Sequence, residues 1–178
     1  MGLFNFWKKE KEQKDSKDIV EKLNPHSIDI FVDDKLNIAF IPTLHTKIGY
    51  GQSISYFKLL DSPYSFSDIG NVFIQVLNDM RLEPILNGGE EIEPAYKIIT
   101  GGKGFLAFQR KRQLIKVSFS DKMKFEYWYR KKRGFGLDKG DKEILIELPL
   151  DSSASEIGKA VDDIYFEVNR YHLTDEIS

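Results

Sequence analysis

The feature that most constrains this chain is the similarity between its two halves. Three blocks of the first half recur in the second half, 85 to 88 positions later, and each block has a clear structural meaning. A repeat of this kind indicates one supersecondary unit that the chain uses twice. We therefore expect two repeats, at about 18–81 and 94–172, that form a single domain spanning 18–178. At 178 residues, the chain is long enough for a hydrophobic core of ordinary size.

The first two blocks predict strands. In each repeat, apolar and polar residues alternate on both sides of an Asp-Lys pair, which is Asp34-Lys35 in the first repeat and Asp121-Lys122 in the second. Alternation with a period of two is typical of half-buried strands, and the polar break between them is typical of a tight turn. A Gly-aromatic-Gly turn and a third strand-like run follow each hairpin. The matched segments are 31–40 with 118–127, 49–51 with 134–136, and 54–60 with 143–148.

The third block predicts a capped helix in each repeat. Ser65 is followed three residues later by Asp68, and Ser153 is followed by Glu156. Such a pair forms a capping box, because the serine hydroxyl and the acid each accept a hydrogen bond from a free N–H of the first turn. Apolar residues follow with helical spacing, and each helix has a glycine in its first turn. These positions are Ile69, Gly70, Phe73, Val76, Leu77 and Met80 in the first repeat, and Ile157, Gly158, Val161, Ile164, Tyr165 and Val168 in the second. The shared glycine predicts close packing of helix against strand, and inheritance from an ancestral unit is the alternative explanation.

Shorter segments complete the prediction of the fold. Residues 18–23 predict a short helix before the first hairpin. Residues 105–112 taken alone fit a strand or a helix, and the repeat favours a helix that is the counterpart of 18–23. Residues 82–93 contain a proline and an Asn-Gly-Gly run, so we expect a linker there. The order α-β-β-β-α, used twice, indicates an α+β protein with a largely antiparallel sheet and helices packed on one side. Residues 1–17 are aromatic and charged, and we expect them to form a flexible tail.

Composition narrows the class of protein further. The chain has no cysteine, which excludes a disulfide scaffold and a cysteine-ligated zinc site and suits a reducing cytoplasm. No apolar run approaches the roughly 20 residues that span a bilayer. Residues 1–9 place their aromatic side chains before two lysines, which is the wrong order for a signal peptide. We expect a cytoplasmic protein, and membrane contact by residues 1–9 is the less favoured alternative.

No pattern in the sequence supplies catalytic, cofactor-binding or metal-binding residues. The run 100–104, Thr-Gly-Gly-Lys-Gly, lacks the Ser or Thr that follows the lysine of a phosphate-binding loop. The three histidines, His26, His45 and His172, lack the spacing of metal ligands. We therefore expect no cofactor, no metal and no enzymatic activity.

Charge is unevenly distributed along the chain. Residues 94–140 carry thirteen basic and three acidic residues, although the whole chain has a formal net charge of −2. Aromatic residues interleave with the cations over 103–139, which is typical of a platform for single-stranded nucleic acid. Alternation along one strand explains the same pattern, and both interpretations stay open. Strand alternation would place Phe125, Tyr127 and Tyr129 on one side of the strand and Glu126, Trp128 and Arg130 on the other.

The second repeat also resembles a known family. Its Gly-Phe-Gly turn at 134–136 precedes an apolar strand that ends in Leu-Pro at 144–149, and a Ser-Ala-Ser-Glu-Ile-Gly helix start follows at 153–158. This arrangement is similar to that of the immunity proteins of bacterial contact-dependent growth inhibition systems (CdiI), over about 18–170. The first repeat departs from the pattern, with Leu-Asp-Ser-Pro at 60–63 where Leu-Pro is expected. The resemblance implies a cytoplasmic, non-enzymatic antitoxin that binds the toxin domain of a cognate effector.

Contact residues do not transfer from the resemblance, so the candidates come from charge alone. Electrostatic complementarity selects partners and speeds association. We predict partner binding by the basic, aromatic face of the second hairpin and by an acidic stretch of the last helix. The candidates are Lys124, Trp128, Arg130, Lys131, Lys132, Arg133, Asp162 and Asp163. The alternative is a nucleic-acid-binding module that uses the basic aromatic belt of residues 103–139.

Overall fold

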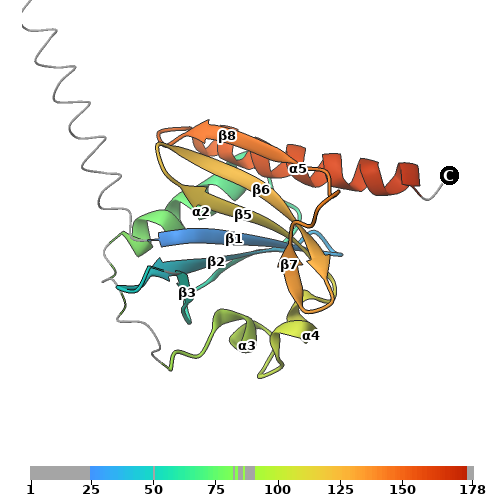
Figure 1. Ribbon diagram of the computed structural model, residues 1–178. Coiled ribbons are helices and arrows are strands. Elements are labelled where there is room, and N and C mark those ends of the chain that lie inside the picture. Colours follow the sequence, from blue (N-terminus) through green and yellow to red (C-terminus); the bar gives the residue numbers. More distant parts are fainter. Residues whose placement is uncertain (1–24, 50, 82, 84–85, 87–90, 176–178) are drawn as a thin grey trace, which may run out of the picture.

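The computed structural model describes residues 25–49, 51–81, 83, 86 and 91–175, and these form a mixed α+β fold (Figure 1). Eight strands lie within these residues, and every strand pair among them is antiparallel. The strands are β1 (Pro25–Asp33), β2 (Ile38–His45), β3 (Gly51–Ser53), β4 (Lys58–Leu60), β5 (Arg112–Phe119), β6 (Lys122–Lys131), β7 (Gly134–Gly136) and β8 (Leu145–Pro149). The helices are α2 (Phe66–Met80), α3 (Ala95–Ile99), α4 (Phe105–Gln109) and α5 (Ala154–Asp175).

The order of the strands is symmetric about the centre of the sheet. It is β3-β2-β1-β5-β6-β7, with β4 also paired to β2 and β8 also paired to β6. The two central strands, β1 and β5, pair antiparallel with Ile30 opposite Ile115. Each half of the order therefore contains one predicted hairpin and its two following short strands. The duplication itself stays a prediction from the sequence.

The main core lies between one face of the sheet and the two long helices. Figure 1 shows α2 and α5 together on this side of the strands. Alternate residues of the strands point toward them, and Ile28, Ile30, Phe40 and Phe125 are fully buried there. Burying a side chain of this size contributes about 1.5–3 kcal/mol. The predicted fold class, α+β with a largely antiparallel sheet and helices packed on one side, is confirmed, and the two long helices cover that side.

A second apolar cluster forms around the short helices α3 and α4. It contains Phe31, Ala39 and Leu114, which lie between first-core residues along their strands and so point to the opposite face. Ala95 of α3 and Phe108 of α4 are fully buried against them.

The helix predicted over 105–112 is too long. It ends at Gln109, because Arg112 already pairs with Asp33 as the first residue of β5. The run predicted as one strand at 54–60 is strand only over Lys58–Leu60, whereas the run at 143–148 corresponds to β8.

Both predicted capping boxes are present. The Ser65 hydroxyl accepts from the Asp68 N–H at 3.2 Å, and the Asp68 carboxylate accepts from the Ser65 N–H at 2.8 Å. The same two bonds join Ser153 and Glu156, at 3.3 and 2.7 Å. These contacts fix where α2 and α5 begin.

The predicted packing of the two helix glycines against strands is wrong, because both glycines lie where α2 and α5 cross. A Cβ on Gly70 would lie 1.8 Å from the carbonyl oxygen of Ala154, and a Cβ on Gly158 would lie 1.9 Å from that of Phe66. The absence of a side chain at both positions lets the two helix backbones come this close. The glycines therefore serve a helix–helix contact.

Some expectations fall outside the described residues. These are the tail at 1–17, its membrane contact at 1–9, and the short helix at 18–23. The linker at 82–93 is described only in part, and within it Leu86 forms a parallel bridge with Thr46. None of the described helices is long and apolar enough to cross a membrane.

Candidate functional site

Two adjoining hollows line α5 beside the turn between β1 and β2. The larger, which we call the cationic cleft, has a volume of about 530 Å³. The smaller, which we call the apolar hollow, has a volume of about 230 Å³. Val32 and Tyr165 line both, so the two hollows form one groove along the helix, the α5 groove.

The fold brings four basic residues to the cationic cleft from two places in the chain. Arg110, Lys111 and Arg112 lie where α4 ends and β5 begins, and Arg130 lies near the end of β6. Because β5 and β6 pair antiparallel, the start of one strand lies beside the end of the other. The sheet thereby gathers cations that lie about twenty residues apart in sequence.

The acidic residues of the cleft are already occupied. The Asp33 carboxylate accepts from the N–H groups of Lys35 and Asn37, both at 2.9 Å, and so closes the β1–β2 turn. The Asp34 carboxylate lies 3.2 Å from the Lys111 ammonium. Of the four cations in the cleft, only Lys111 is therefore paired with a carboxylate among the described residues.

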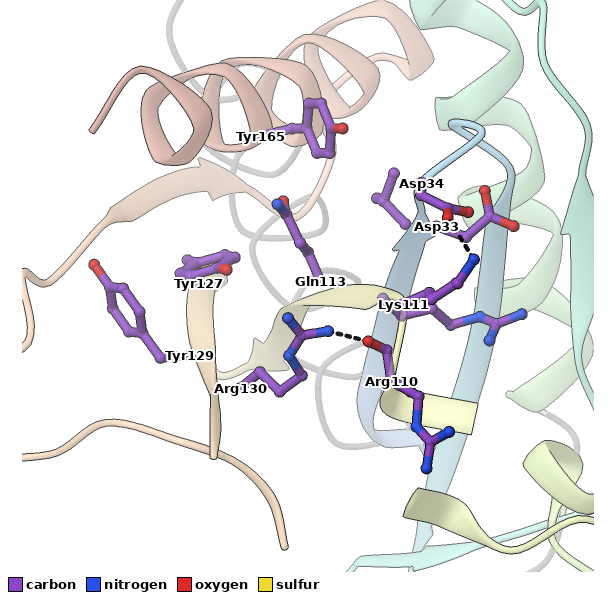
Figure 2. Close-up of a pocket in the computed structure, with 11 residues that line it drawn as sticks. Asp33, Asp34, Arg110, Lys111, Gln113, Tyr127, Tyr129, Arg130 and Tyr165 are labelled. Carbon is purple, nitrogen blue, oxygen red and sulfur yellow. Dashed lines mark hydrogen bonds and ion pairs between the residues drawn. The ribbon is translucent and has the colours of Figure 1, made fainter. Parts of the chain in front are cut away.

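Two of the three arginines of the cleft are held by neutral groups. Arg112 donates to the carbonyl oxygen of Phe108 at 2.7 Å, and its guanidinium lies 4.3 Å from the centre of the Phe108 ring. Arg130 donates to the carbonyl oxygen of Arg110 (Figure 2). Carbonyl oxygens fix the position of a guanidinium without cancelling its charge, and each guanidinium has five N–H donors. The cleft is consequently positive, with donors left to bind an anion.

Aromatic and amide side chains form the other wall of the cleft. Figure 2 shows Gln113 between Arg130 and Tyr165 of α5, with Tyr127 and Tyr129 to one side. Burial raises the pKa of Tyr127 to about 12, so its hydroxyl stays protonated at neutral pH. The Gln113 amide nitrogen donates to Asn169 at 3.1 Å, while its buried amide oxygen has no hydrogen-bond partner among the described residues. This wall offers uncharged polar groups to a ligand.

The apolar hollow is lined mainly by hydrophobic side chains. Leu36 is 42% exposed and Phe166 is 58% exposed, and they lie on either side of it, on the turn and on α5. Asp162 is the one acidic residue among those that line it. Burial, with a smaller effect of Asp163, raises the pKa of Asp162. Exposed large apolar side chains around a hollow are typical of an interaction site.

The structure separates the residues predicted to bind a partner. Arg130 lines the cationic cleft and Asp162 lines the adjoining hollow, so one member of each predicted patch lies in the α5 groove. Asp163 pairs instead with Lys159 on the surface of α5. Lys132 and Arg133 are exposed in the turn between β6 and β7.

The remaining predicted cations are neutralised by nearby acids. Lys131 lies 2.8 Å from Asp138 and 2.6 Å from Asp141. Lys124 lies 3.2 Å from Glu126, which also accepts from the Trp128 indole N–H at 2.7 Å. The strand alternation predicted for β6 is present, since Phe125 and Tyr127 belong to the first core and Trp128 to the second cluster. The basic belt is therefore not one continuous positive face.

The prediction missed most of the cationic cleft. Arg110, Lys111 and Arg112 were counted in the basic belt but were not singled out, and Tyr165 was assigned to the apolar stripe of its helix. The run of three cations at the start of a strand was the one available signal. A site that draws on two strand ends, a turn and a helix has no single motif in the sequence.

A second polar cluster lies on the face of the sheet opposite α2 and α5. The Lys116 ammonium is 3.2 Å from Asp29 and 3.1 Å from the Ser27 hydroxyl, which also meets Thr43 at 2.9 Å. A Ser–Lys pair is known as a nucleophile and base, but Ser27 is 0% exposed and out of a substrate's reach. No group of three or more His, Asp or Glu within the described ranges is placed to hold a metal ion.

Comparisons with known proteins give similarity in fold. No protein-family model matches the chain, and no curated protein matches it in sequence. A protein of unknown function from Neisseria meningitidis has 14% identity and a TM-score of 0.57, over 80% of this chain and 94% of that one. A chain of the CdiA-CT/CdiI toxin and immunity complex from Yersinia pseudotuberculosis has 14% identity and a TM-score of 0.51, over 76% of this chain and 92% of that one. The protein thus shares its fold with a component of a toxin and immunity complex.

Proposed function

We propose that the protein is an immunity protein of the CdiI type, which acts in the cytoplasm, has no enzymatic activity, and binds and neutralises the toxin domain of a cognate effector. The observation that carries this proposal is the likeness in fold to a chain of a CdiA-CT/CdiI complex, which covers 92% of that chain. The motifs of the second repeat, over 134–158, support the same family independently of the overall fold.

The surface of the protein is consistent with this role. An inhibitor of this kind needs an interaction surface rather than a catalytic centre, and the α5 groove provides charged and apolar groups side by side. Interfaces that discriminate between partners combine buried apolar contacts with charges that must match.

Co-expression with a toxin domain tests the proposal. The toxin domain is taken from the C-terminus of the large secreted protein encoded next to this chain, and it is induced in cells that carry this protein or an empty vector. We expect growth to be restored only by this protein, and a stable complex to elute in size-exclusion chromatography. The matched control is a toxin domain from an unrelated effector, against which no protection is expected. Unrestored growth together with the absence of a complex would refute the proposal.

The alternative is binding of single-stranded nucleic acid by the belt at 103–139. Its support is the excess of cations there, but several of these are paired with acids, Lys122 with Glu147 at 3.0 Å among them. Fluorescence polarisation with labelled RNA and DNA oligonucleotides over a range of salt concentrations separates the two functions. Affinity that falls steeply with salt, in the absence of any protein partner, would favour the nucleic-acid role.

A further inference from the structure

We infer that the cationic cleft is the receptor for a carboxylate side chain of the toxin domain, and that the apolar hollow takes a neighbouring apolar side chain of the same segment. This inference rests on the proposed function and names the chemistry by which the partner is recognised. It concerns Arg110, Arg112 and Arg130, and the hollow around Leu36 and Phe166.

The first argument is the charge that the cleft retains. Arg112 and Arg130 donate to carbonyl oxygens, and the two acids of the cleft are engaged elsewhere, Asp33 within its turn and Asp34 with Lys111. Three arginines consequently line one hollow, and none of them has a carboxylate partner among the described residues. A guanidinium binds a carboxylate through two parallel N–H bonds, which gives both strength and orientation.

The second argument is that two of the arginines, Arg112 and Arg130, are already in position. The Arg112 guanidinium lies over the Phe108 ring, and the Arg130 guanidinium donates to the backbone carbonyl oxygen of Arg110. A long side chain that is fixed before binding loses less conformational entropy when the ligand arrives. Exposed lysines of the belt, such as Lys132 in the β6–β7 turn, have no such support.

The third argument decides between a carboxylate of a protein and the phosphates of a nucleic acid. Asp162 lines the apolar hollow next to the cleft and would repel a chain that continues there with one negative charge per nucleotide. A protein segment carries its charge at one point and continues with apolar residues. Leu36 and Phe166 are exposed next to the cleft, where they can cover an apolar side chain of that segment.

Charge reversal in the cleft tests the inference on the complex itself. Arg110→Glu and Arg130→Glu should each raise the dissociation constant of the purified toxin domain by about tenfold or more, measured by isothermal titration calorimetry. Arg81→Glu is the matched control, because it makes the same change in charge at an exposed residue that follows α2 and does not line the groove. It should change the dissociation constant by no more than about threefold. Circular dichroism spectra and melting temperatures check that each variant is folded.

A small probe tests the cleft without the toxin. Acetylated and amidated glutamyl-phenylalanine is titrated into ¹⁵N-labelled protein, with the glutaminyl analogue and inorganic phosphate as comparisons. We expect the arginine Nε–Hε signals of the wild type to shift with the glutamyl peptide and not with the glutaminyl peptide. In the Arg110→Glu variant, these shifts should be reduced.

The outcomes separate this inference from the proposed function. If the wild type binds and neutralises the toxin, but Arg110→Glu and Arg130→Glu bind as tightly as Arg81→Glu does, the cleft is not the receptor and the immunity role stands. An equal loss in all three variants indicates general attraction of charge and likewise overturns the inference. Shifts with phosphate alone assign the cleft to phosphate and overturn it too. If the wild type does not bind the toxin, the proposed function and this inference fail together.

Discussion

The crossing of α2 and α5 gives the sharpest test of the fold. In Gly70→Ala, the added methyl group would lie 1.8 Å from the carbonyl oxygen of Ala154, whereas ordinary contact begins at 3.4 Å. The two helices would have to separate by about 1.6 Å, the difference between these distances. Because the obstacle is backbone rather than a side chain that can rotate, we expect a cost near the upper end of the range for overpacking, about 3 kcal/mol.

A favourable effect opposes this cost. Replacing glycine by alanine inside a helix stabilises the helix by about 1 kcal/mol. The net result is a loss of about 2 kcal/mol in the free energy of unfolding, which for a chain of this size lowers the melting temperature by about 4–8 °C. Urea unfolding followed by far-UV circular dichroism measures the loss. Gly158→Ala should behave in the same way, since its methyl group would lie 1.9 Å from the Phe66 carbonyl oxygen.

Two comparisons make this prediction refutable. Gly136→Ala is the control, because a Cβ there would have no atom within 4 Å, and we expect almost no change. In the double variant of Gly70 and Gly158, the second methyl group enters a crossing that the first has already opened. The double variant should therefore lose less than the two single losses combined. A stabilised Gly70→Ala would mean that helix propensity alone acts, and would contradict the close crossing.

Three further predictions concern single contacts. Ser65→Ala removes the hydroxyl that caps α2 and should lower the free energy of unfolding, measured in urea, by about 1 kcal/mol. Ser65→Thr keeps a capping hydroxyl and should keep most of that stability, so equal losses in the two variants would contradict the cap. Lys116→Ala leaves the mostly buried Asp29 carboxylate without its cation and should lower the free energy of unfolding by about 3 kcal/mol. The double variant Asp29→Asn with Lys116→Met removes both charges and should recover part of that loss. Hydrogen bonds from the Ser65 side chain and backbone lower the pKa of Asp68 from 3.8, its ordinary value in the unfolded chain. The Asp68 carboxylate therefore contributes its full stabilisation above pH 3.8, and this stabilisation is lost as the pH falls through the lower pKa of the folded state. The difference in melting temperature between the wild type and Asp68→Asn should accordingly shrink below about pH 4, and a constant difference would refute the assignment.

Features that depend on neighbours in sequence were predicted well. The hairpin turns follow from alternation on both sides of the Asp-Lys pairs, and the starts of α2 and α5 follow from Ser65 and Ser153. In both cases the groups that interact lie within a few residues of one another. Local patterns are then sufficient, because the same few residues supply the donors, the acceptors and the apolar stripe.

Features that depend on distant neighbours were not predicted. The repeat favoured a helix up to Arg112, yet α4 ends at Gln109 and the pairing of Arg112 with Asp33 makes Arg112 the start of a strand. The charges show the same limit. Lys131 and Arg130 are adjacent in sequence, but Lys131 is neutralised by Asp138 and Asp141, whereas Arg130 is held by a carbonyl oxygen and keeps its charge. Which cation is available to a partner is therefore decided by the tertiary structure.

The predicted duplication relates core positions of the two repeats to one another, whereas it does not relate the groove positions in the same way. With the helix offset of 88, buried positions of α5 correspond to buried positions of α2, which suits a core that two copies must share. These pairs are Ile157 with Ile69, Val161 with Phe73, Ile164 with Val76 and Val168 with Met80.

The groove positions do not correspond in this way. Asp162 matches Ile74 in the helix, and Arg130 matches Thr43 at the strand offset of 87, so neither of these two charges has a counterpart in the first repeat. If the duplication is real, an ancestral unit supplied the fold, and the charge of the groove arose after the two copies diverged. Substitutions that exchange paired core residues between the repeats should then affect stability and leave partner binding unchanged, whereas Arg130→Thr should weaken binding while the melting temperature stays the same.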